Sequence, residues 1–136
     1  MIRTLIGVFV GLAVMLVTVV ALEALGQLAF PRPSGLDFGD PEQARRVMEL
    51  LPPGALFFVV AGWIAGTAFG ACVAATIAHE LKLSAAIAVG AVMQLLVVAN
   101  LVMLPHPWWM AIGSALLPLP SAWLGYTLAV RRAAAR

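Results

Sequence analysis

The chain has 136 residues, 63% of them hydrophobic and only 10% charged, with a formal net charge of +2. Soluble domains carry about 25% charged residues, so a soluble fold of this length could not bury so much apolar surface. The small net charge, spread along the chain, gives no electrostatic footprint for nucleic acid. The composition therefore predicts a membrane protein with helical spanning segments, because in lipid the backbone must satisfy its own hydrogen bonds.

The first apolar run covers residues 5–30 and contains one ionisable side chain, Glu23. A secretory signal peptide is the competing interpretation, with residues 24–26 as its cleavage site. Signal cores, however, are typically about 7 to 15 residues long. We therefore expect this run to be a retained first transmembrane helix.

Residues 31–53 form the only long connection between apolar runs, and residues 31–35 favour an extended turn. Asp40 then fits a helix N-cap, with Pro41 in the first helical position and Gln43 completing a capping-box-like start. A short amphipathic helix should follow in the outer headgroup region, with its apolar stripe in lipid or against the bundle, and end at the prolines 52–53. The stripe consists of Ala44, Val47, Met48 and Leu51.

Three more apolar runs follow, each near or above the roughly 20 residues that cross about 30 Å of hydrocarbon. They cover residues 55–78, 83–104 and 108–130. None of them alternates between polar and apolar residues, which excludes a transmembrane β-barrel. The connections are short, so consecutive helices should be antiparallel neighbours. The predicted architecture is all-α, with one transmembrane domain over residues 1–136 that forms an integral membrane four-helix bundle.

The orientation follows from arginine and lysine in short loops, because these residues resist translocation and mark the cytoplasmic side. One side of the predicted bundle receives Arg3, Lys82, Arg131, Arg132 and Arg136. The other side receives Arg32, Arg45 and Arg46. We therefore expect both termini to be cytoplasmic, in a bacterial inner membrane.

Small residues descend the run 55–78 in steps of four and form a ridge on which another backbone can pack closely. The ridge begins with Gly62, Gly66 and Gly70. Its partner is either another helix of the same chain or a second copy, and four helices in one chain already need internal seams.

Two prolines interrupt the run 108–130, namely Pro118 and Pro120. Each removes a backbone donor, so we expect the fourth helix to bend there. Such a bend is either static or part of gating, as broken helices are in transporters.

Glu23 is the most informative residue, because an acidic side chain inside a spanning helix is costly and usually needs a reason. It lies about 10 Å from the middle of its helix toward the outer face, at about 1.5 Å per residue. Asn100 lies at a similar depth on the third run, and Gln94 lies near the middle of that run. One interpretation is a proton or cation site that opens to the outside. The other is a structural hydrogen bond between Glu23 and Asn100, with further partners in Arg32, Gln27 or His106.

Other reactive side chains are few. Cys72 is the only cysteine and lies in an apolar run, where a free thiol usually packs as a small apolar group. His79 and His106 fall on opposite sides of the predicted membrane, so they cannot share a metal ion. No recognisable motif joins a nucleophile, a base and an oxyanion donor. We therefore expect no enzymatic activity and no catalytic, cofactor or metal site.

Three parts of the sequence resemble small four-span bacterial inner-membrane proteins of unassigned function. They are EALG at 23–26, FPRPSGLD with DPE across 30–42, and NLVMLPHPWW at 100–109. This resemblance implies a fold with four membrane spans and a location in the bacterial inner membrane. In architecture the chain is also similar to small multidrug-resistance transporters, which use a glutamate of the first helix for coupled proton and drug binding. That similarity implies Glu23 as the counterpart, although it lies away from the helix centre and an amphipathic segment is added.

Two functions agree with these features. The chain has many small residues suited to close helix packing and few reactive side chains. These features favour an association or scaffold protein, such as an accessory subunit of a larger membrane complex. The alternative is a small homo-oligomeric proton-coupled transporter or pore that uses Glu23, with Asn100 and Gln94 facing inward. The expected partners are the lipid bilayer and either a membrane protein or a second copy, without nucleic acid. A polar cavity around Glu23 would favour transport, and a closed bond to Asn100 would favour a structural role.

Overall fold

The computed structural model describes residues 1–31, 40–104 and 106–135, and within these the chain is helical without strands. The predicted all-α class is therefore confirmed. The expected turn over 31–35, Arg32 and Arg136 lie wholly or mostly outside the described residues. Six helices are described: α1 Ile2–Ala29, α2 Pro41–Leu50, α3 Pro53–Ile77, α4 Lys82–Met103, α5 Trp108–Leu116 and α6 Pro118–Ala134.

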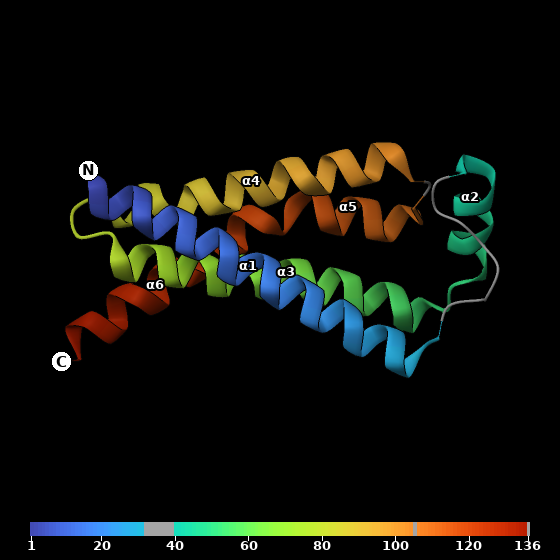
Figure 1. The fold of residues 1–136 in the computed structure, drawn as a ribbon, viewed down its shortest axis with the longest axis horizontal. Helices are drawn as coiled ribbons and strands as arrows, with labels where there is room; N and C mark the ends of the chain where they lie inside the picture. The colour runs from blue at the N-terminus through green and yellow to red at the C-terminus, as the bar shows by residue number, and fades with distance from the viewer. Residues whose placement is uncertain (32–39, 105, 136) are drawn as a thin grey trace.

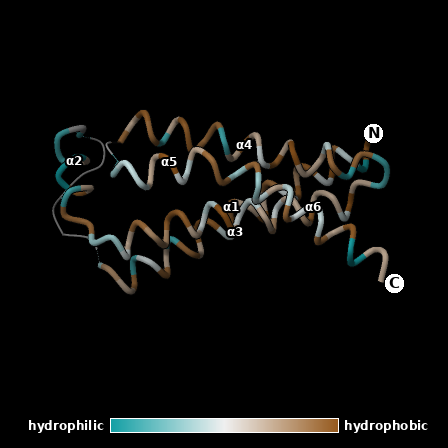
Figure 2. Tube along the Cα trace, turned by 180° about the vertical axis from the view of Figure 1, so that it is seen from behind, coloured by the Kyte–Doolittle hydropathy of each residue, from teal (hydrophilic) through white to brown (hydrophobic). Residues whose placement is uncertain are grey.

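Helices α1, α3 and α4 are each long and apolar enough to cross a membrane. They run alongside one another, and both termini lie at the end of the bundle opposite to α2 (Figure 1). Hydrophilic residues gather at the two ends of the chain's long axis, whereas the helices between them are mostly hydrophobic (Figure 2). This distribution confirms transmembrane helices in a multi-pass arrangement.

The fourth predicted span is two helices rather than one, because α5 stops at Leu116 and α6 starts at Pro118. Pro118 and Pro120 have no N–H, so the carbonyls of Ser114 and Leu116 lose their usual helical partners. The remaining bonds across the break run from Leu117 N to Gly113 O and from Ser121 N to Leu117 O, both 3.0 Å. Proline is tolerated in the first turn of a helix, so the chain can restart as α6 at once.

A side chain from α4 supports this break. Gln94 Nε2 donates to the carbonyl oxygen of Ala115 at 3.0 Å. The acceptor lies between the two carbonyls that the prolines leave unpaired. Neighbouring helices commonly re-satisfy backbone groups that proline frees in a membrane. The predicted polar residue Gln94 is therefore placed as an interhelical link between α4 and α5.

Gln94→Met should lower the free energy of unfolding by about 0.6 kcal/mol, the average for an interhelical hydrogen bond in a membrane. Methionine keeps the length of the side chain but cannot donate to Ala115 O. The measurement is reversible unfolding in mixed micelles, compared with Thr127→Val. Thr127 Oγ1 donates to Leu124 O within one helix, at 2.8 Å. Equal stability of wild type and Gln94→Met would show that this bond contributes nothing.

The glycine ridge of α3 packs against α1 of the same chain. A Cβ atom placed on Gly70 would lie 2.6 Å from the carbonyl oxygen of Gly11, and one on Gly66 would lie 2.9 Å from that of Met15. Gly62 is looser, because its Cβ would come no closer than 3.6 Å to α1. The seam between α1 and α3 therefore brings the two backbones together through these small residues.

Helix α2 begins as its sequence predicts, with one difference in the cap. Asp40 Oδ1 accepts a hydrogen bond from Glu42 N at 3.0 Å. Gln43 Nε2 donates to Asp40 Oδ2 at 2.9 Å, rather than Gln43 reaching back to the backbone of the cap residue. On the apolar face Ala44 and Val47 are buried. Met48 and Leu51 pack against the main core cluster, so this part of the stripe faces the bundle.

These hydrogen bonds, first of all the one from Gln43, lower the pKa of the Asp40 carboxyl below its ordinary 3.8. Because the pKa is lower in the folded protein, the charged Asp40 carboxylate stabilises α2 at pH values above 3.8. This stabilisation is lost as the pH falls through the folded-state pKa. Gln43→Met should therefore raise the pKa of Asp40 toward 3.8. Carbon-13 NMR titration of the carboxyl measures it, with Glu42→Gln as the control that leaves it low. An unchanged pKa in Gln43→Met would contradict this assignment.

Candidate functional site

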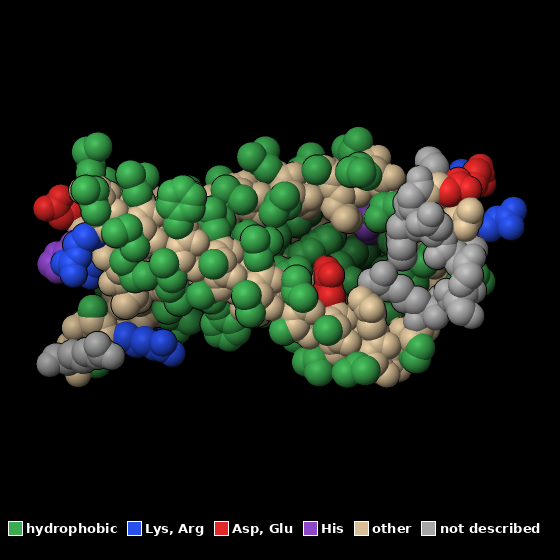
Figure 3. Space-filling model, in the orientation of Figure 1, with side chains coloured by type: hydrophobic (Ala, Val, Ile, Leu, Met, Phe, Trp, Pro, Cys, Tyr) green, Lys and Arg blue, Asp and Glu red, His purple; other side chains and the backbone are tan. Residues whose placement is uncertain are grey.

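A cavity of about 230 Å³ lies at the α2 end of the bundle, lined by residues of α1 to α5 and their connections. The space-filling view shows a hollow in the apolar surface with an acidic side chain at its rim (Figure 3). The polar lining residues are Glu23, Gln27, Asn100 and His106, and the aromatic ones are Phe30, Phe58 and Trp63. Aliphatic side chains and methionines complete the wall.

The aromatic side of this cavity arises where α1 meets the start of α3. Gly26 of α1 lies directly on Phe58, because a Cβ atom there would be 2.8 Å from the Phe58 Cβ. The rings of Phe30 and Phe58 are tilted against each other, with centroids 6.3 Å apart. Trp63, one and a half turns further along α3, is buried. Close backbone approach at Gly26 therefore gathers the rings at the cavity wall.

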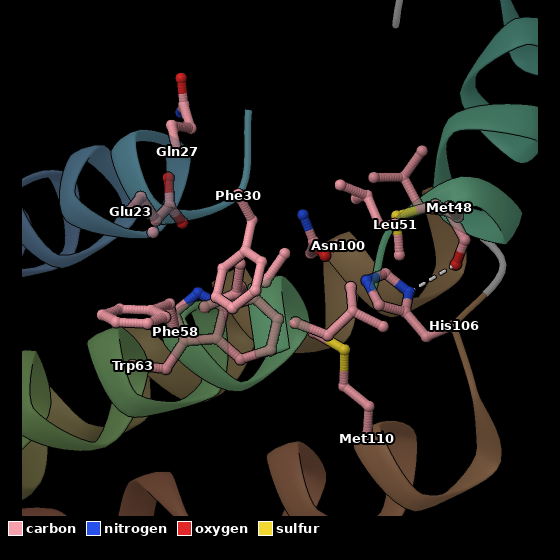
Figure 4. A pocket seen from close by; sticks show the side chains of 15 residues that line it. Glu23, Gln27, Phe30, Met48, Leu51, Phe58, Trp63, Asn100, His106 and Met110 are labelled. Atoms are coloured by element: carbon pink, nitrogen blue, oxygen red, sulfur yellow. Dashed lines mark hydrogen bonds between the residues drawn. The ribbon is translucent and has the colours of Figure 1, made fainter. Parts of the chain in front are cut away.

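The structure brings two of the three predicted polar residues to this cavity. Glu23 on α1 and Asn100 on α4 both line it and are half-buried. Gln94 does not, because its amide bonds Ala115 O of α5. Gln27 lies one turn beyond Glu23, and its side chain extends away from the other labelled residues (Figure 4). Glu23 and Asn100 therefore belong to one cavity, whereas Gln94 belongs to the helix break.

His106 contributes a fourth polar group, from the connection between α4 and α5. Its Nδ1 lies 2.7 Å from the carbonyl oxygen of Leu104, and the half-buried ring lines the cavity. Two features of the sequence indicated that His106 could lie near this cavity. It stands between two prolines, and it falls on the same predicted side of the membrane as Glu23 and Asn100. Met48 and Leu51, in and just after α2, also line the cavity. The sequence did not predict this, because an amphipathic pattern does not indicate where the helix packs.

The charge and the lining together define what the cavity can bind. Glu23 is the only ionisable carboxyl among the lining residues that the structure describes, and most of the others are apolar or aromatic. A carboxylate acts over a longer range in such a medium than in water. The faces of Trp and Phe attract cations as well. The arrangement is therefore suited to a small positively charged molecule with an apolar body.

Comparison with known proteins gives no relative: no family model matches the sequence, and neither a curated protein nor a solved structure is significantly similar to it. Among the described residues, no group of three or more His, Cys, Asp or Glu side chains could hold a metal ion. We therefore infer function from the cavity and from the distribution of charge along the bundle.

Proposed function

We propose that this protein is a small membrane transporter that binds an amphipathic organic cation in the cavity at Glu23 and exchanges it for protons. The observation that carries the proposal is the placement of Glu23 in one cavity with Asn100 and the rings of Phe30, Phe58 and Trp63. A carboxylate in such a place holds either a cation or a proton. Protonation neutralises it and releases the cation, which gives exchange without further chemistry.

The packing of the helices supports this choice over a scaffold. The small-residue ridges were the main reason to expect association, and Gly66 and Gly70 are occupied by α1 of the same chain. On the other side of α3, Gly125 of α6 packs so closely that a Cβ atom would lie 2.9 Å from the Cβ of Ala71. Both seams are thus internal.

We place the chain in a bacterial inner membrane with four crossings, of which α5 and α6 together make the last. Arg3, Lys82, Arg131 and Arg132 lie near the end that holds both termini, and this excess of positive charge favours the cytoplasm. The cavity then opens on the outer side, beneath α2. The break at Leu117 agrees with this class of function, because discontinuous helices are common in transporters.

A matched pair of ligands tests the proposal. Benzyltrimethylammonium and its neutral carbon counterpart, neopentylbenzene, have the same shape and differ in charge. Calorimetry with the protein in lipid nanodiscs should show the cation binding at least tenfold more tightly, with empty nanodiscs as the control for partition into lipid. In vesicles with an imposed pH gradient, the cation should move against the proton. Equal binding of both ligands, or no movement, would contradict the proposal.

A second candidate function is association with another membrane protein or with a second copy. It is favoured by α1, in which only Gly7, Gly11, Met15 and Gly26 are buried. Most of this helix therefore faces outward, toward lipid or a partner. Crosslinking after gentle detergent extraction should then recover a defined complex. A lone monomer under every mild condition would contradict association.

A further inference from the structure

His106 is held in one tautomer by its surroundings. Its Nδ1 lies 2.7 Å from Leu104 O. A carbonyl oxygen can only accept a hydrogen bond, so Nδ1 must carry the proton and donate. In the neutral ring the other nitrogen, Nε2, then has a lone pair and accepts. The loop therefore fixes both the orientation of the ring and the chemical character of its free side.

The free side of the ring belongs to the cavity. Figure 4 shows the bonded nitrogen directed to the Leu104 carbonyl, and the second ring nitrogen on the opposite side, toward the space lined by Asn100. The same view places Glu23 and His106 at opposite sides of the cavity. The ring of Phe30 and the side chain of Asn100 lie between the two in that view, and the ring of Phe58 is tilted against that of Phe30. The cavity thus has a hydrogen-bond acceptor at each end and a partly aromatic middle.

We infer that His106 selects ligands which carry a hydrogen-bond donor at the end opposite to their positive charge. The ammonium would lie at Glu23, the body along the aromatic rings, and a hydroxyl or N–H would donate to His106 Nε2. This inference rests on the proposed function, since it assigns the second end of the same ligand. The ligand class is therefore an amine with a distal hydroxyl or N–H, such as a hydroxyphenyl alkylamine.

The test compares three ligands that share one ammonium-bearing chain. They are phenethylammonium, its 4-hydroxy derivative, which can donate, and its 4-methoxy derivative, which can only accept. Wild-type protein should bind the hydroxy compound about tenfold more tightly than phenethylammonium, as one additional hydrogen bond allows. The methoxy compound should gain nothing. In His106→Leu the ratio of the two affinities should fall to about one, while His79→Phe, at the exposed end of the bundle, keeps it near ten.

A second measurement is independent of whether His106→Leu folds. Nitrogen-15 NMR of the wild-type protein should show Nδ1 protonated and Nε2 unprotonated, and Nε2 should shift upon binding of the hydroxy compound alone. If phenethylammonium binds but the hydroxy group adds no affinity, the inference is wrong and the proposed function stands. If no amine binds, both are wrong. An Nε2 that carries the proton would also overturn the inference.

Discussion

Replacing Glu23 with Gln should weaken binding of an organic cation about 10- to 100-fold, because two opposite charges about 4 Å apart attract each other by about 1 kcal/mol in water and about 4 kcal/mol near a protein surface. Glutamine keeps the size and polarity of the side chain while it removes the negative charge. Binding is measured by calorimetry with benzyltrimethylammonium in nanodiscs. Proton-driven movement of the cation in vesicles should stop as well, since the amide cannot exchange a proton for the ligand.

Glu80→Gln is the matched control for this substitution. Glu80 is an exposed glutamate in the connection between α3 and α4, at the other end of the bundle from α2. Its replacement changes the net charge by the same amount without touching the cavity. Equal affinity of wild type and Glu23→Gln would remove Glu23 from the binding site. A comparable loss in Glu80→Gln would show that net charge, rather than the cavity, attracts the cation.

Local sequence patterns predicted the elements well, because lipid leaves few choices for the backbone. Continuous apolar length indicated helices where α1, α3 and α4 lie, and Asp40 with Pro41 indicated the start of α2. The break in the fourth run was only partly predictable. Pro118 and Pro120 predicted a bend, but its full extent also depends on contacts with neighbouring helices. The bond from Gln94 of α4 to Ala115 O, beside the freed carbonyls, joins residues 21 positions apart in the sequence.

The cavity was less predictable than the helices, because it depends on how they meet. Depth along each helix brought Glu23 and Asn100 to a similar level, and both line the cavity. Depth alone said nothing of the direction in which Gln94 points. The aromatic wall of the cavity depends on the close approach of Gly26 to Phe58. The wall formed by Met48 and Leu51 depends on where α2 packs against the bundle. Such non-local geometry leaves no periodic signal in a single sequence.

The seam between α1 and α3 should be sensitive to any added side-chain volume. Gly70→Ala should lower the free energy of unfolding by about 1 to 3 kcal/mol, the usual cost of overpacking. The new Cβ would lie 2.6 Å from Gly11 O and 2.8 Å from the Met15 Cβ. The first of these is backbone, so α1 must move as a whole. This penalty must exceed the gain of up to about 1 kcal/mol that alanine brings to a helix.

Other glycines of the chain provide a graded control for this prediction. Gly113→Ala meets nothing closer than Leu117 Cδ1 at 3.9 Å, so it should leave stability unchanged or raise it. Gly62→Ala has its nearest contacts at 3.6 Å and should be close to neutral. Reversible unfolding in mixed micelles should therefore rank Gly70→Ala below Gly62→Ala, and Gly62→Ala at or below Gly113→Ala. Since Gly11 and Gly70 each face the other's carbonyl, their double substitution should cost less than the sum of the single ones. Equal stability of Gly70→Ala and Gly113→Ala would mean that the two backbones are not in contact at this seam.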